Sequence, residues 1–341
     1  MDWKELKNNS RIREIFETRI KILKLTREFF WQKDFKEVET SVAVKFPGQE
    51  PYLNPIPVKF HDPNKKVYDF YLQTSPEFAM KKILGAGYKN IFQICKCFRD
   101  FEQFGGNHNT EFTMIEWYRV PGKPDNIMDD MENLFKYIDR KINATCHPES
   151  ERRICFNTTW ERISMKELWK RELDINLDEN LSLENLSKIA EDLGYKVDER
   201  DVYEDVFYKI FLNKIEAKLG IEKPVFVYDY PSQMCSLSKV CENDDRYSQR
   251  FELYINGIEL ANGFGELTVS QKQKQLLESD KEQRKGLGKE TWDVDEGFIE
   301  AIDNIKDDAS GVALGVDRMV MLFAGANNLN EVIFGSVDDQ L

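Results

Sequence analysis

Apolar residues recur every three or four positions in several segments of this chain, and this spacing predicts amphipathic helices. The first predicted helix begins near Ser10, a suitable N-cap, and ends near Trp31. Two more are predicted over 183–193 and 202–219, and each is followed by a glycine, which commonly terminates a helix. The charged stretch 269–305 is also expected to be helical. Helices are therefore expected near the start, in the middle and toward the end of the chain.

Other segments are short and apolar and are bounded by turn residues, as is typical of β-strands. Residues 91–98 and 111–120 are predicted to be two strands joined by a loop rich in glycine and asparagine. Within 251–264, Asn256-Gly257 is the preferred two-residue hairpin turn. Further strands are predicted at 37–40, 224–230 and 311–316. Because strands and helices cluster separately, their order predicts an α+β fold whose sheet is largely antiparallel.

The predicted hairpin places two glutamates on one face. Its turn would set Glu252 opposite Ala261, so that Glu252 and Glu259 become diagonal neighbours, roughly 7–8 Å apart at the backbone. Two carboxylates so placed repel each other unless a cation bridges them, and Mg²⁺ on a nucleotide phosphate is one candidate. The alternative is that both side chains face solvent. The opposite face is predicted to carry Leu260, Asn262 and Phe264, with Glu266 just beyond the strand.

One face of strand 111–120 carries an acidic side chain among apolar ones. By the two-residue period of a strand, Phe112, Met114, Glu116 and Tyr118 share a face. A carboxylate buried on such a face needs a partner, because burying it alone costs roughly several kcal/mol. A structural salt bridge and a cationic ligand are both compatible with this pattern.

The predicted strand at 311–316 has a bare face, formed at alternate positions by Gly311, Ala313 and Gly315. A face without side-chain bulk leaves room for another group, so something is expected to lie against it. Arg318 follows this strand, and Arg99 follows strand 91–98. Together they offer two guanidinium groups suited to bidentate contacts with phosphate.

Composition and charge narrow the possible functions. The chain is 41% hydrophobic, enough for a sizeable core, and its formal net charge is −13. The acidic balance argues against non-specific nucleic-acid binding, which depends on basic patches. No stretch has the ~20 apolar residues of a membrane span or the apolar segment of a signal peptide, so we expect a cytoplasmic protein. The six cysteines lack a disulfide framework spacing, and Cys95 and Cys97 are interpreted as packing residues rather than metal ligands.

Several segments resemble the motifs of the class II aminoacyl-tRNA synthetase catalytic domain. The first helix and strand 37–40 are similar to motif 1, with Ser41 where that motif usually ends in proline. The segments similar to motif 2 are 98–102, 108–109 and 111–114, and the segment similar to motif 3 is 311–318. Three stretches are of the lysine type, namely TSPE at 74–77, FTMIEWYR at 112–119 and ELANGF at 259–264. The resemblance implies one catalytic domain over 1–341 with a helical insertion at about 145–222.

The resemblance also implies roles for individual residues. Arg99 and Arg318 would be catalytic and would hold the phosphates of ATP. Other residues around the nucleotide would be Glu102, His108, Asn109, Phe112, Glu259, Leu260 and Gly315, with Phe112 stacked on adenine. The amino-acid substrate would be bound by Ser75, Pro76, Glu77, Glu116, Tyr118, Asn262, Phe264, Glu266 and Ala313. Mg²⁺ would be held by Glu252 and Glu259. In the motif 2 loop, Phe101 occupies the usual place of the adenine-reading glutamate, so that role is assigned to Glu102.

Within the class, the chain begins directly at the catalytic domain, without the anticodon-binding barrel of lysyl-tRNA synthetases. In this it resembles synthetase paralogues that activate (R)-β-lysine and transfer it to a lysine of elongation factor P. Elongation factor P is therefore the expected partner, and a homodimer is the expected assembly. Ala313 favours the resemblance to these paralogues, because lysyl-tRNA synthetases typically have glycine at this position. Two alternatives are a truncated lysyl-tRNA synthetase, which would charge tRNA or make only the adenylate, and a non-catalytic amino-acid sensor.

Overall fold

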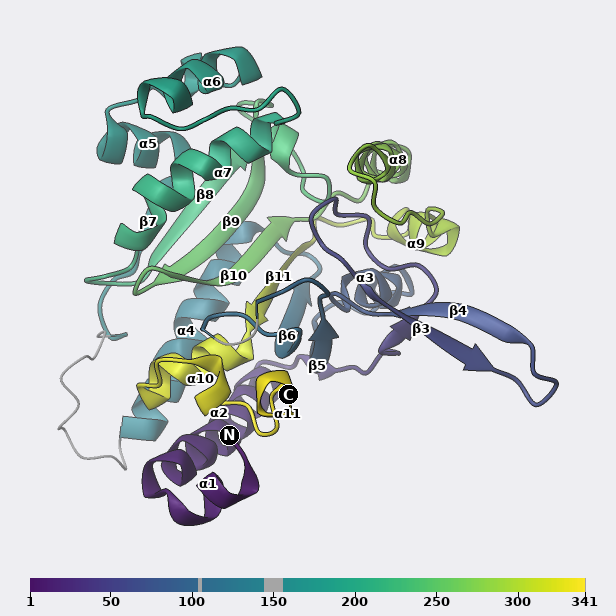
Figure 1. Cartoon of the computed structure of the whole chain (residues 1–341), viewed down its shortest axis with the longest axis vertical. Coiled ribbons are helices and arrows are strands. Elements are labelled where there is room, and N and C mark those ends of the chain that lie inside the picture. Colours follow the sequence, from purple (N-terminus) through teal and green to yellow (C-terminus); the bar gives the residue numbers. More distant parts are fainter. Residues whose placement is uncertain (104–105, 144–155, 341) are drawn as a thin grey trace.

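A large mixed sheet forms the centre of the protein (Figure 1). The computed structural model describes residues 1–103, 106–143 and 156–340. Within them, the strands of this sheet lie in the order β1-β5-β6-β11-β10-β9-β8-β7. Their bounds are β1 (Lys36–Glu37), β5 (Ile91–Phe98), β6 (Glu111–Arg119), β7 (Glu161–Ser164), β8 (Val225–Pro231), β9 (Tyr247–Ile255), β10 (Ile258–Gly265) and β11 (Ser310–Gly315). Neighbours are antiparallel except β1 with β5 and β7 with β8, which are parallel. The predicted α+β fold with a largely antiparallel sheet is confirmed.

Three helices cover one face of the sheet and enclose the main hydrophobic core (Figure 1). They are α2 (Ser10–Gln32), α4 (Pro124–Asn143) and α10 (Val316–Ala324). The start of α2 was predicted at the right place but with the wrong cap. Asn9 is the N-cap, and its side-chain oxygen accepts a hydrogen bond from the backbone N–H of Arg11 at 3.0 Å. No helix in the described part of the chain has both the length and the apolar character needed to cross a membrane.

The predicted helical insertion is only partly helical. Residues 145–155 of it lie outside the described residues. Its helices are α5 (Met165–Leu173), α6 (Leu183–Asp192) and α7 (Tyr203–Lys214), with short 3-10 turns at Leu177–Glu179 and Glu216–Lys218. They pack on β8 and β9 around a second hydrophobic cluster. The insertion also supplies β7, which extends the sheet beside β8 and was not predicted from the hydrophobic spacing.

A smaller three-stranded sheet was not predicted from the sequence. It consists of β2 (Ala43–Val44), β4 (Val67–Leu72) and β3 (Ile56–His61), in that order. The β3–β4 hairpin projects from the body of the protein (Figure 1). Three further helices are α3 (Glu77–Gly85), α8 (Ser270–Gly286) and α9 (Glu296–Ile302), and 3-10 turns lie at Ser232–Met234 and Leu329–Glu331. The charged stretch 269–305 is therefore two helices.

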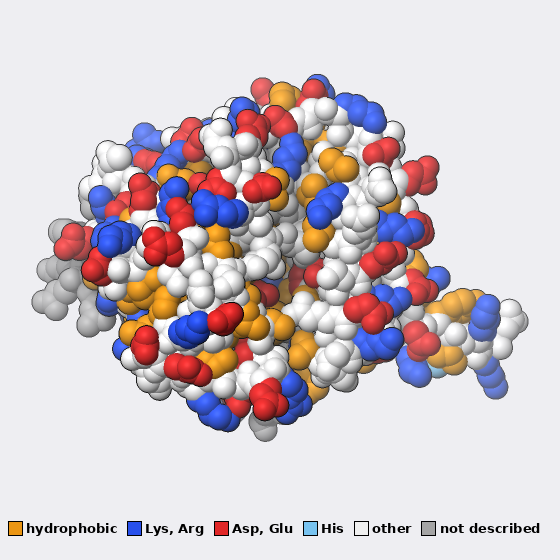
Figure 2. All heavy atoms as spheres, turned by 90° about the horizontal axis from the view of Figure 1, so that it is seen from above, with side chains coloured by type: hydrophobic (Ala, Val, Ile, Leu, Met, Phe, Trp, Pro, Cys, Tyr) orange, Lys and Arg blue, Asp and Glu red, His pale blue; other side chains and the backbone are white. Residues whose placement is uncertain are grey.

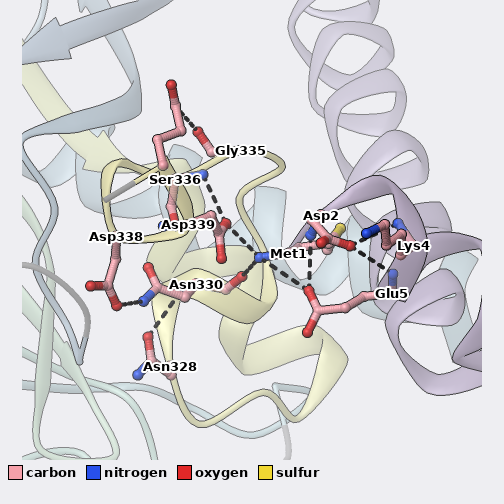
Figure 3. A network of polar contacts seen from close by, with 11 residues as sticks. Met1, Asp2, Lys4, Glu5, Asn328, Asn330, Gly335, Ser336, Asp338 and Asp339 are labelled. Atoms are coloured by element: carbon pink, nitrogen blue, oxygen red, sulfur yellow. Dashed lines mark hydrogen bonds and ion pairs between the residues drawn. The ribbon is translucent and has the colours of Figure 1, made fainter.

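The first and last elements lie side by side (Figure 3). Helix α1 (Trp3–Asn8) follows Met1, whose amino group donates to the carbonyl of Asn330 at 2.8 Å and to the carboxylate of Asp339 at 2.6 Å. Asp339 belongs to α11 (Val337–Gln340). The carboxylate of Glu5 lies 3.7 Å from the same amino group. These contacts fasten α1 to the C-terminal segment.

Candidate active site

A cavity of about 510 Å³ lies over the face of the sheet that α2, α4 and α10 leave free. The molecule is hollowed near the middle of the face shown in Figure 2, and acidic and hydrophobic side chains are visible inside the hollow. The predicted site residues that line the cavity are Ser75, Glu77, Arg99, Glu102, His108, Asn109, Phe112, Glu116, Glu259, Leu260, Asn262, Phe264, Ala313, Gly315 and Arg318. Those that do not line it are Pro76, Tyr118, Glu252 and Glu266.

Strand register explains why residues far apart in sequence meet at this cavity. Gln93 is paired with Glu116, and Glu116 with Ala313. Ala313 is paired in turn with Asn262, and Asn262 with Glu252. Directly paired residues point to the same side of a sheet, so these five side chains form one row across five strands. The middle three residues of this row, Glu116, Ala313 and Asn262, line the cavity.

A β-bulge at Leu260 corrects the predicted hairpin register. The turn itself is as predicted, but the extra residue sets Glu252 opposite Asn262 instead of Ala261. A one-residue shift moves every later side chain to the other face of a strand. Asn262 and Phe264 therefore share the face of Glu252, whereas the sequence placed them opposite it.

Glu252 and Glu259 each have an arginine of the protein nearby, Arg250 beside Glu252 and Arg318 at 3.9 Å from Glu259. Glu252 is buried and forms an ion pair with Arg250. The hydroxyl groups of Tyr230, at 2.5 Å, and of Tyr254 also donate to its carboxylate. Within the described ranges, no cluster of three or more His, Cys, Asp or Glu side chains is placed to hold a metal ion. Only Glu259 of the pair lines the cavity, and the binding of Mg²⁺ by the two glutamates stays a prediction.

Arg250 is a site residue that the sequence analysis missed. Its guanidinium donates to Asn262 Oδ1 and to the hydroxyl of Tyr208, both at 3.1 Å, and it pairs with Glu252. It thereby fixes the side chain of Asn262 in the cavity wall. Its position two residues before Glu252 on the same strand face was the available signal.

The two predicted phosphate-binding arginines lie in the same part of the cavity. Backbone carbonyls hold Arg318, which donates from Nη1 to Glu259 at 2.5 Å and from Nε to Asn107 at 3.2 Å. The guanidinium of Arg99 lies 5.1 Å from the centre of the Phe112 ring, within cation–π distance. Its buried Nε has no hydrogen-bond partner among the described residues. A donor left in this state is available to an anionic ligand.

Asn109, at the adjacent wall, also has buried polar atoms that are available to a ligand. It is 4% exposed, and both polar atoms of its amide lack hydrogen-bond partners in the part of the chain that is described. Buried amides are normally satisfied, so this one fits a ligand that both donates and accepts hydrogen bonds, as adenine does. The arginines and Asn109 together match the demands of a nucleotide.

The motif 2 loop places Glu102, and not Phe101, at the cavity. Phe101 has φ of +59° and its side chain is 87% exposed. Glu102 lines the cavity, and its carboxylate lies 3.1 Å from His108 Nδ1. This hydrogen bond lowers the pKa of Glu102. Glu102 is thus the carboxylate available at this wall, and its role in reading adenine stays a prediction.

A buried lysine that was not predicted holds together two predicted substrate ligands. Lys81 Nζ lies 2.5 Å from Glu77 Oε1 and 2.5 Å from Glu266 Oε2. Burial by itself would lower the pKa of Lys81, but the charges of Glu266 and Glu77 outweigh it and raise the pKa. Glu77 is the first residue of α3, and Ser75 Oγ accepts a hydrogen bond from its N–H at 3.0 Å. The i, i+4 spacing of Glu77 and Lys81 was the available signal.

The surroundings of Glu116 distinguish between a structural salt bridge and a cationic ligand, the two partners that the sequence left open. It is 1% exposed, and Tyr118 donates to its Oε2 at 3.0 Å. Its Oε1 has no hydrogen-bond partner, and no described cation forms a salt bridge with it. Burial, reinforced by the charge of Glu77, raises its pKa well above the usual value. A structural salt bridge is thus not what Glu116 makes, and its free oxygen favours a cationic ligand.

The bare face of β11 is covered at one end by the protein. A Cβ on Gly311 would lie 2.2 Å from the Tyr118 ring, so this glycine makes room for the tyrosine and not for a ligand. At Gly315 the nearest atom to such a Cβ would be 3.7 Å away, which leaves the other end open. Only Ala313 and Gly315 of the three line the cavity.

The fold and this cavity define the class of protein. Residues 2–336 match the family model of class II tRNA synthetases (D, K and N), so the chain belongs to this family. Within it, the chain is similar to proteins named elongation factor P--(R)-beta-lysine ligase. The one from Avibacterium paragallinarum is 34% identical over 324 residues, which are 94% of this chain and 95% of that protein. The one from Salmonella paratyphi B is 35% identical over 324 residues, 94% of each. The resemblance to this ligase group is confirmed.

Proposed function

We propose that the protein activates (R)-β-lysine with ATP and transfers it to a lysine of elongation factor P. The names of its relatives support the substrate and the acceptor. The observation that carries the proposal is one cavity with two unlike parts. Arg99, Arg318 and Asn109 offer donors for a nucleotide in one part, and Glu77 and Glu116 face the cavity in the other. An adenylate-forming enzyme needs both parts side by side.

The charge of the acidic part matches a diamino acid. Glu77, Glu116 and Glu266 carry three negative charges when ionised, and Lys81 neutralises one. Glu50 also lines the cavity near Glu77, so acidic groups exceed the single lysine here, as binding of a substrate with ammonium groups requires. The free Oε1 of Glu116 is a ready acceptor for one of these ammonium groups. Asn262, held by Arg250, lines the cavity and would contact the substrate carboxylate.

In the proposed reaction, the carboxylate of the amino acid attacks the α-phosphate of ATP and pyrophosphate leaves. Arg99 and Arg318 neutralise the charge that grows on the phosphates, and Phe112 supports the adenine ring. The amine of the acceptor lysine then attacks the carbonyl of the adenylate, and AMP leaves. No residue of the protein forms a covalent intermediate, so positioning and charge neutralisation carry the catalysis.

The family implies a divalent metal, but the described side chains around this cavity do not form a metal site of their own. Glu252 is engaged by Arg250 and two tyrosines, so Glu259 is the carboxylate of the pair that is open to the cavity. We therefore assign no step to a metal held by the protein. Mg²⁺ bound to the phosphates of ATP would contact Glu259 at the cavity wall. A homodimer and the exclusion of tRNA likewise belong to the proposal.

The proposal is tested in two stages. ATP–pyrophosphate exchange is measured with (R)-β-lysine and with L-lysine, and the activated amino acid is then offered to elongation factor P and to tRNA. We expect faster exchange with (R)-β-lysine and transfer to the protein alone. Transfer to tRNA would instead identify a truncated lysyl-tRNA synthetase, and the absence of exchange would identify a sensor.

A further inference from the structure

Two cysteines on the site face of β5 lie in contact with each other. Cys95 Sγ and Cys97 Sγ are 3.9 Å apart, and neither is in a disulfide. They are paired with Met114 and Phe112 of β6, both of which line the cavity. Cys146 and Cys155 lie outside the described residues, and the other two described cysteines, Cys235 and Cys241, are also free. The proposed reaction uses none of these thiols.

The two thiols differ in a way that assigns them different chemistry. Cys97 is buried, whereas Cys95 is partly exposed. The hydrogen bond between them lowers the pKa of Cys95 and raises that of Cys97. An accessible thiol with a lowered pKa is the one that oxidants attack first, and a neighbouring thiol can then resolve the product. Cys95 has the first of these properties, and Cys97 is placed for the second.

We propose that Cys95 and Cys97 form a modification site that closes to a disulfide when a hydroperoxide is present. Cys95 attacks the peroxide, whose O–O bond breaks, and becomes a sulfenic acid while an alcohol or water leaves. Cys97 then attacks the sulfenic sulfur, the S–S bond forms and water leaves. The peroxide is reduced by two electrons, and the two thiols are oxidised.

Strand geometry allows this bridge but only with local strain. Residues two apart in a strand have Cα atoms about 6.6 Å apart, near the upper end of the disulfide range. The sulfur atoms must approach from 3.9 Å, so β5 is pinched at Lys96. A strained bridge is easily reduced by small thiols, which makes the modification reversible.

Pinching β5 would disturb both parts of the cavity. The carbonyl of Lys96 accepts a hydrogen bond from Gln73 Nε2 at 2.9 Å, and Gln73 directly precedes the segment that carries Ser75 and Glu77. On the other side, Arg99 lies two residues beyond Cys97. Closure of the bridge therefore displaces ligands of the amino acid and of the phosphates together, and activity is expected to fall.

Trypsin digestion provides a direct test on the full chain. Trypsin cuts after Lys96, so the reduced protein yields Cys95 and Cys97 in separate peptides, and the bridge joins them. After treatment with hydrogen peroxide we expect these two peptides to be linked and ATP–pyrophosphate exchange to fall at least tenfold. Dithiothreitol should restore both. In Cys97→Ser, dimedone should label Cys95, and in Cys95→Ser exchange should resist peroxide. Cys241→Ser is the matched control and should behave like the unmodified protein.

Several outcomes would overturn the inference. Linkage of either cysteine to a different one, or no linkage at all, would remove the modification site. Loss of exchange in Cys95→Ser at the same peroxide concentration would show that another group is the target. A bridge that forms without loss of exchange would contradict the coupling through Lys96. The peptide readout does not depend on which amino acid is activated, so it can succeed or fail separately from the proposed function.

Discussion

The two parts of the cavity have opposite charge: the nucleotide part contains Arg99 and Arg318, and the ammonium part contains Glu77 and Glu116. The nucleotide part is cationic and partly open, and its arginines are oriented by backbone carbonyls and an aromatic ring. The ammonium part is anionic and buried, and its carboxylates are held by a lysine of the protein. Exposed charges are stabilised by water, whereas buried charges must be neutralised from within. The comparison teaches that loss of a charge should affect catalysis in the first part and folding in the second.

Replacing Lys81 by methionine should have the largest effect on stability. Glu77 and Glu266 would remain buried without their cation, and breaking a buried pair costs about 3–5 kcal/mol. The free energy of unfolding is measured by urea denaturation. Lys82→Met is the matched control, because its ion pair with Asp295 is more exposed and should be worth about 1 kcal/mol or less. Equal losses in the two variants would contradict the contrast between the parts.

Replacing Arg318 by alanine should affect activity more than stability. Removing a preorganised donor from a transition state typically lowers the rate about 100- to 1000-fold. We expect that loss in ATP–pyrophosphate exchange, with the urea midpoint nearly unchanged. Arg246→Ala, an arginine that pairs with Asp244 outside the cavity, serves as control. Exchange that survives in Arg318→Ala would remove the phosphate role.

Much of the fold could be predicted from local patterns, because those patterns act over a few residues. The spacing of apolar residues located β5, β6 and α2, and Asn256-Gly257 located the hairpin turn. The bulge at Leu260 could not be predicted, since it follows from how β10 packs between β9 and β11. The small sheet was hidden by the prolines around it.

The site was predicted less evenly than the fold. Glu102 and Glu116 are recognisable from motif and strand pattern, and both line the cavity. Lys81 was missed because its partner Glu266 is distant in sequence. Arg250 was missed because its partner Asn262 lies on the neighbouring strand. A sequence pattern shows which groups need partners. Tertiary structure decides which partner each one finds.

A smaller effect is expected at the boundary between the two parts. Ala313 lies in register between Glu116 and Asn262, beside both predicted substrate contacts. One methyl group in a pocket is worth about 1–3 kcal/mol of discrimination. In Ala313→Gly we expect kcat/KM for L-lysine to rise about tenfold relative to (R)-β-lysine, measured by exchange. Gly315→Ala, at the nucleotide end of β11, should change the KM for ATP without altering this ratio.

The smallest predicted effect is a proton released on binding. The raised pKa of Glu116 means that its carboxyl group holds a proton in the free protein over a wider pH range than an exposed glutamate. A bound ammonium group favours the ionised carboxylate, so binding releases protons and affinity rises with pH until Glu116 is ionised without ligand. Calorimetry with (R)-β-lysine in buffers of different ionisation enthalpy measures this release, which should be below one proton per site. In Glu116→Gln the release should shrink toward zero.

A release that persists unchanged in that variant would assign the proton to another group, such as Glu266, whose pKa burial raises to about 7. The proton released on binding would then come from the glutamates paired with Lys81 and not from Glu116.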